Sequence, residues 1–170
     1  MRAKMVEFER LPDDGDLHEL DGGELIVMPP QGLRHGIVQA AVLEELSRAA
    51  DFGIVPGRCG FRLAPDVVQA PDVAFIRGER TAEIAWDRYC EFGPDLAVEI
   101  LSPDDNAARL QRKISGYLAA GTGIVRVLDP DSITVNVYQK PDVFRTLTAD
   151  DRIDAPELLP GFSVAVRAPV

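Results

Sequence analysis

The chain has 170 residues, 46% of them hydrophobic, and a formal net charge of −10 with a pI of about 4.6. This length suits a single domain over residues 1–170 that buries its own core. The excess of acids argues against tight, nonspecific nucleic-acid binding, which depends on Lys and Arg neutralising phosphates. It excludes neither metal-binding acids nor a local basic face.

No apolar run approaches the roughly 20 residues that a membrane span needs. Residues 1–10 lack the apolar centre of a signal peptide. We therefore expect a cytoplasmic protein with no membrane partner.

Turn signals and hydrophobic spacing divide the first half of the chain. Residues 18–28 are typical of a hairpin that turns at Asp21-Gly22-Gly23. A helix is predicted from about Gly32 to Ala50, because apolar positions recur every three or four residues. An irregular strand is predicted over 54–63, and an apolar strand over 72–76.

The second half begins with an apolar strand at Leu96 that leads into a helix. Ser102 suits the N-cap of that helix, Asp105 the third position of a capping box, and Gly121 the C-terminal stop. A hairpin is predicted over 124–138, with further strands near 144–147 and within 158–166.

Asp72 and Glu99 occupy matching points of two apolar runs. A charged Glu99 buried without compensation would cost several kcal/mol, so we expect an Arg partner, a metal ion or a protonated carboxyl. If the two strands pair, both carboxylates face one spot, where Mg²⁺ takes one or two carboxylates plus waters. The alternative is a pair of solvated acids at strand ends, or Glu99 bound to an Arg.

Two other side chains lie on helix faces that point toward these strands. Lys113 is at the edge of the apolar stripe of the second helix, where its ammonium either extends toward Glu99 or stays in solvent. His35 is on the inward face of the first helix, as a core residue or as an accessory site residue. Arg109 and Arg112 are expected to face solvent.

These residues fall within motifs that resemble the Uma-two family of restriction-endonuclease-like proteins, a branch of the PD-(D/E)XK nuclease superfamily. The resemblance is strongest over residues 19–138 and rests on the order and spacing of several short segments. They are Glu19-Leu20-Asp21-Gly22-Gly23-Glu24-Leu25, His35, Pro71-Asp72-Val73-Ala74-Phe75, Pro94 to Pro103, Lys113, Tyr117, Gly121 and Val127-Leu128-Asp129-Pro130.

The resemblance implies an α/β (α+β) fold, with a central mixed sheet flanked by helices and an N-terminal hairpin. It also implies a site in which Asp72 and Glu99 hold a Mg (or Mn) cation. The superfamily usually places a lysine two residues after the second acid, where this chain has Leu101. The family is thought to take its lysine from the next helix, and Lys113 matches that position. Arg109 departs from the pattern, because family members usually have Asp there.

Together these features predict a metal-dependent nuclease acting on phosphodiester bonds, with DNA as the expected substrate. Asp72, Glu99 and Lys113 are the catalytic candidates, and Lys113 would position the attacking water or stabilise charge on the phosphate. The alternative is a catalytically inactive, dimeric interaction module with the same fold. A homodimer is expected on either reading, with the hairpin over 124–138 as the candidate contact because it offers an apolar edge.

Overall fold

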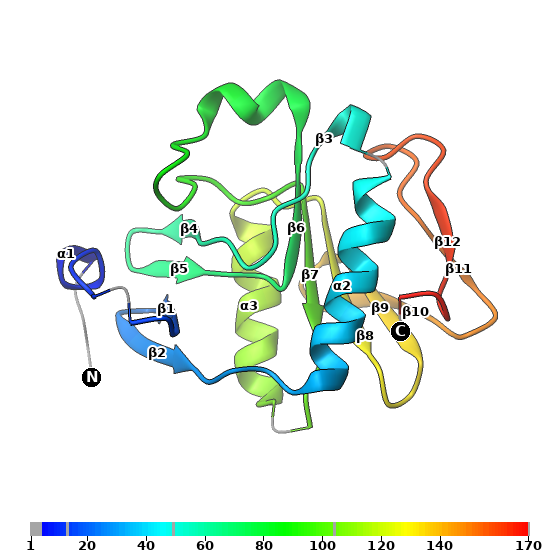
Figure 1. Cartoon of the computed structure of the whole chain (residues 1–170), viewed down its shortest axis with the longest axis horizontal. Helices are drawn as coiled ribbons and strands as arrows, with labels where there is room; N and C mark the ends of the chain where they lie inside the picture. The colour runs from blue at the N-terminus through cyan, green and yellow to red at the C-terminus, as the bar shows by residue number, and fades with distance from the viewer. Residues whose placement is uncertain (1–4, 13, 49, 104, 170) are drawn as a thin grey trace.

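A computed structural model describes residues 5–12, 14–48, 50–103 and 105–169. Its centre is a six-stranded sheet in the order β10-β9-β8-β7-β6-β3 (Figure 1). Strands β7 and β8 are parallel and the other neighbours are antiparallel, so the sheet is mixed. Its strands are β3 (Gly53–Ile54), β6 (Val73–Arg77), β7 (Leu96–Ile100), β8 (Ile124–Asp129), β9 (Thr134–Lys140) and β10 (Val143–Leu147).

Two helices cover opposite faces of this sheet, α2 (Leu33–Ser47) and α3 (Ala107–Ala119). Every residue of β7 is buried. Leu96, Val98 and Ile100 pack into the core under α2, whereas Ala97 packs into the core under α3. Because successive strand residues point to opposite faces, Glu99 belongs to the face that α3 covers.

A second sheet, in the order β2-β1-β5-β4, carries the predicted N-terminal hairpin. Its turn uses Gly22 and Gly23, whose φ angles of 57° and 80° are easily adopted only without a side chain. The mixed central sheet, the two flanking helices and this hairpin confirm the predicted fold class. The second sheet consists of β1 (Leu17–Asp21), β2 (Glu24–Met28), β4 (Phe61–Ala64) and β5 (Val67–Gln69).

The remaining elements are short. They are α1 (Met5–Phe8), the 3₁₀ helices η1 (Ala50–Phe52) and η2 (Gly78–Glu83), and the strand pair β11 (Arg152–Asp154) and β12 (Ser163–Ala165). Within the described ranges, no helix has the length and apolar character needed to cross a bilayer.

The prediction that α3 begins at Ser102 is wrong. Ser102 and Asp105 form a turn in which the Ser102 amide donates to Asp105 Oδ2 at 2.7 Å, the hydrogen bond expected of a capping box. The helix begins only at Ala107, and the side chain of Asn106 caps it. Lys113 therefore lies two turns into the helix rather than three.

The hairpin over 124–138 does not offer the expected apolar edge. Strand β8 lies between β7 and β9, and β9 also pairs with β10. Strand β10 forms this edge of the sheet instead, with Val143 and Phe144 exposed, and β3 forms the opposite edge. The homodimer itself stays a prediction.

Candidate active site

Strand pairing brings Asp72 and Glu99 to one place. Strands β6 and β7 pair Val73 with Val98 and Ala74 with Ala97. Continuing this antiparallel register by one residue sets Asp72 opposite Glu99, and residues directly opposite each other point to the same face. Both carboxylates line one pocket of about 40 Å³, which we call the central pocket. A water needs roughly 10–15 Å³ of such space, so the pocket has room for about three water-sized groups.

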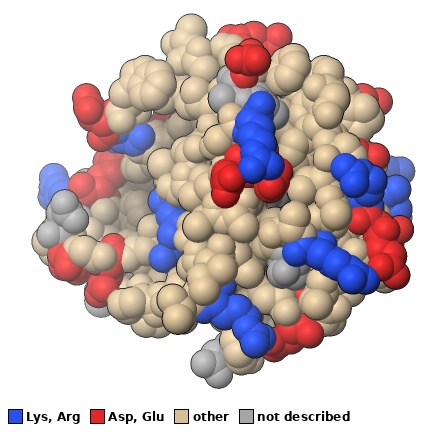
Figure 2. All heavy atoms as spheres, turned by 45° about the vertical axis from the view of Figure 1, so that its right-hand side comes forward, with Lys and Arg blue, Asp and Glu red and all other residues tan. Residues whose placement is uncertain are grey.

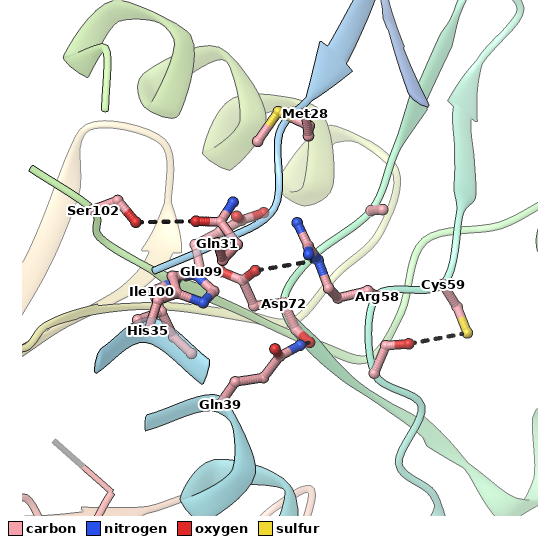
Figure 3. A network of polar contacts seen from close by, with 12 residues as sticks. Met28, Gln31, His35, Gln39, Arg58, Cys59, Asp72, Glu99, Ile100 and Ser102 are labelled. Atoms are coloured by element: carbon pink, nitrogen blue, oxygen red, sulfur yellow. Dashed lines mark hydrogen bonds and ion pairs between the residues drawn. The ribbon is translucent and has the colours of Figure 1, made fainter. Parts of the chain in front are cut away.

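Asp72 is held by donors from two elements (Figure 3). Its Oδ2 accepts from the amide of Ile100 at 2.8 Å and lies 3.1 Å from His35 Nε2. The side chain of Gln39 donates to the backbone carbonyl of Asp72 at 2.7 Å. His35 is buried on the inward face of α2, so the predicted accessory residue contacts a predicted site acid. The structure therefore brings His35 and Asp72 together.

Glu99 is bound by two side chains from α3. Lys113 Nζ lies 2.8 Å from its carboxylate, and the Tyr117 hydroxyl donates to Oε1 at 2.8 Å. Glu99 and Lys113 are each only 7% exposed. The geometry thus joins all three catalytic candidates, because Asp72 faces the same pocket.

Glu19 is a third acid in this cluster, and the sequence did not single it out as a site residue. It lies in β1, is 2% exposed, and is 3.1 Å from Lys113 Nζ. Its other partners are the amide of Ala70 at 3.0 Å and Arg109 at 2.6 Å. The prediction that Arg109 faces solvent is therefore wrong, because its guanidinium turns in to neutralise a buried acid. Arg112 is exposed, as expected, and pairs with Asp21.

The proximity of these charges moves their pKa values. Burial raises the pKa of Glu99 to about 7, and the negative charges of Asp72 and Glu19 add to the rise while Lys113 opposes it. Burial alone would lower the pKa of Lys113, but Glu99 and Glu19 outweigh it and raise that pKa. For Glu19, Lys113, Ala70 and Arg109 overcome the effect of burial and lower the pKa. The ammonium of Lys113 is thus retained at neutral pH.

Two acids of the central pocket are the candidate ligands for a hard cation. Across the described residues, no three His, Cys, Asp or Glu side chains are arranged to hold an ion, which argues against a zinc-type site. Mg²⁺ needs only one or two carboxylates, with waters completing its shell. Asp72 Oδ1 accepts no hydrogen bond within the described part of the chain, and its nearest cation is 3.9 Å away. Asp72 and Glu99 could therefore hold Mg²⁺ or Mn²⁺.

A wider groove of about 550 Å³ opens beside the central pocket. The two share Met28, Gln31, His35, Leu101, Ser102, Asp105 and Arg109 in their linings. The basic lining of the central pocket consists of Arg58, Arg109 and Lys113. The face of the molecule in Figure 2 intersperses Lys and Arg with Asp and Glu, without a broad basic surface.

The chain is similar to known proteins in fold and in sequence. The crystal structure of a "putative nuclease belonging to DUF820" from Anabaena variabilis ATCC 29413 is similar, with a TM-score of 0.84 and 22% sequence identity. The match covers 98% of this chain and 96% of that one, and at this identity it shows a shared fold. A search of curated proteins finds no match. The sequence model of the Uma2 family, described as "Putative restriction endonuclease", matches residues 5–167, and the chain therefore belongs to that family.

Proposed function

We propose that the protein is a metal-dependent nuclease that hydrolyses phosphodiester bonds, with DNA as its substrate. The observation that carries this proposal is the meeting of Asp72, Glu99 and Lys113 at one pocket. Membership of the Uma2 family supports the same reaction class.

Asp72 and Glu99 would hold the Mg²⁺ or Mn²⁺ ion. When bound, such an ion supplies Lewis-acid activation of the phosphodiester and of the attacking water. Lys113 orients Glu99 through the 2.8 Å contact and keeps a positive charge close to the reacting phosphate. His35 fixes Asp72 through its Nε2.

The test is a cleavage assay on single-stranded, duplex and supercoiled DNA and on RNA, with Mg²⁺ or Mn²⁺ and with EDTA as the metal-free control. Glu99→Gln should lower the rate by about 10²-fold or more, because it removes a charged ligand without changing the shape of the side chain. The matched control is Glu91→Gln, because Glu91 is exposed and pairs with Arg62. Equal cleavage by both variants would contradict the assignment.

The alternative of a catalytically inactive, dimeric interaction module is favoured by one observation, the net charge of −10. It predicts that no nucleic acid is cleaved under any of these conditions, and that sedimentation shows a dimer at micromolar concentration. A homodimeric nuclease would also sediment as a dimer, since two-fold symmetry presents two sites to the two strands of a duplex. Cleavage therefore separates the two functions, and sedimentation tests the dimer alone.

A further inference from the structure

Arg58 has an unusual backbone conformation next to the site. Its φ angle is +44°, a left-handed value that residues other than glycine rarely adopt. The Arg58 amide donates to the carbonyl of Asp72 at 3.2 Å, and the Ala74 amide donates to the carbonyl of Pro56 at 2.9 Å. The segment before β4 is thus fixed alongside the start of β6. Strained residues of this kind cluster at functional sites, where the surroundings hold them in place.

The side chain of Arg58 points into the central pocket and makes no hydrogen bond with any described residue. Figure 3 shows Asp72 between His35 on one side and Arg58 on the other. Arg58 Nε and Asp72 Oδ1 form a long ion pair at 3.9 Å, which is beyond hydrogen-bonding range. Nε is buried although the side chain is 28% exposed. A buried donor without an acceptor is costly, so Nε would gain from a ligand oxygen that accepts its hydrogen bond.

The other two cations of the pocket are already paired with buried acids. Lys113 has three protons, and its Nζ lies near three groups, Glu99 at 2.8 Å, Glu19 at 3.1 Å and the Ala70 carbonyl at 3.5 Å. Arg109 uses its Nη2 on Glu19 and on Met28 Sδ. Among the basic side chains that line the pocket, Arg58 is therefore the one that donates no hydrogen bond to any described acid, which leaves its guanidinium for an incoming anion.

We propose that Arg58 binds a phosphate group of the nucleic-acid backbone at the pocket of Asp72 and Glu99. The planar guanidinium presents two parallel N–H donors, which match two oxygens of a phosphate. The pocket is too small for a bulky free ligand, but it adjoins the wider groove. One phosphodiester can therefore enter the pocket while the rest of the nucleic-acid chain lies in the groove. The identity of the ligand rests on the proposed nuclease function, whereas phosphate binding by Arg58 does not require cleavage.

The experiment measures two affinities of the full chain. One is binding of a short fluorescein-labelled DNA duplex in Ca²⁺, followed by anisotropy, and the other is binding of Mn²⁺ alone, followed by electron paramagnetic resonance. Arg58→Ala should weaken DNA binding by about ten- to a hundredfold, the range expected for lost charge-assisted hydrogen bonds. The same change should leave Mn²⁺ affinity equal or tighter, because it removes a positive charge from beside Asp72.

These opposite directions separate binding from support. If Arg58 merely held Asp72 in place, both affinities would fall, and that result would overturn the proposal. Arg58→Lys should restore only part of the DNA affinity, because an ammonium lacks the fork. Arg62→Ala is the control, because Arg62 is 30% exposed, pairs with Glu91 and does not line the pocket. Arg58→Gly is a second variant without the guanidinium, and glycine adopts the observed φ freely. A loss of DNA affinity that it shares with Arg58→Ala therefore does not come from a misfolded backbone.

The failure of each proposal is distinguishable. If the native protein binds the duplex through Arg58 but cleaves nothing, the nuclease proposal fails and the phosphate site stands. If the native protein cleaves DNA and Arg58→Ala binds and cleaves it equally well, the nuclease proposal stands and the role of Arg58 is refuted. Failure of the native protein to bind the duplex at all would also overturn the role of Arg58.

Discussion

Replacing Lys113 with Met tests the electrostatics of the site by removing one charge at nearly constant volume. The ammonium lies 2.8 Å from Glu99 and 3.1 Å from Glu19, and both acids are almost fully buried. Without it, the two carboxylates repel each other and lose a shared donor. Removing one partner of a buried ion pair typically costs about 3–5 kcal/mol. Since a domain is stable by roughly 5–15 kcal/mol in total, Lys113→Met should remove a large fraction of that stability.

Urea unfolding of Lys113→Met at pH 8 and at pH 5 measures this cost. It should be larger at pH 8, because at pH 5 the unpaired carboxyls can take up protons and escape the penalty. The double variant Lys113→Met with Glu99→Gln should recover part of the loss, since it leaves one buried acid instead of two. Lys140→Met, at the exposed end of β9, is the control. A loss at pH 8 within about 0.5 kcal/mol of that control would refute the reasoning.

Three further variants test single features of the site. The pKa of Glu99 is raised from 4.5 to about 7. Between these pH values the folded chain holds a proton that the unfolded chain releases, so the free energy of unfolding falls as the pH rises. Glu99→Gln should therefore flatten the decline in Tm between those pH values, and parallel Tm profiles would contradict the shift. Tyr117→Phe removes the buried 2.8 Å hydrogen bond to Glu99 and should cost about 1.5–3 kcal/mol in urea unfolding; no loss would mean that the bond contributes nothing. Arg58→Gly should raise Tm in calorimetry by about 1–4 °C. Glycine relieves the strain of the left-handed backbone, and this gain exceeds the entropic cost of ordering a glycine on folding by roughly 0.5–1 kcal/mol. A lower Tm would show that the conformation carries no strain.

The main elements of the fold could be predicted because their hydrophobic patterns are long. The predicted helix over 32–50 contains α2, and the hairpin over 124–138 corresponds to β8 and β9. The start of α3 could not be predicted, because Ser102 and Asp105 form the same hydrogen bond in an isolated turn as in a capping box. Local signals of this kind cannot distinguish a helix that starts at once from one that starts a few residues later.

The site was partly predictable for a related reason. Asp72 and Glu99 could be paired from sequence, because each lies at a matching point of a run that is otherwise apolar. Glu19 and Leu20 are adjacent and both buried in β1, so alternation along that strand does not reveal an inward-facing acid. Arg58 lies between strands, and its position depends on a backbone conformation that has no hydrophobic pattern.

The acidic character of the whole chain and the chemistry of the pocket are compatible because the charges are nearly balanced locally. Asp72, Glu99 and Asp105 line the central pocket and Glu19 pairs with two of its bases, so four acids face three bases, Arg58, Arg109 and Lys113. A divalent cation at the carboxylates would therefore make the pocket positive, although the chain carries a net charge of −10. Attraction for a phosphate would then come from the pocket and not from a basic surface. An acidic protein of this kind can bind nucleic acid only where the phosphate backbone of the nucleic acid reaches the carboxylates and their cation. Binding is therefore coupled to the place where cleavage would occur.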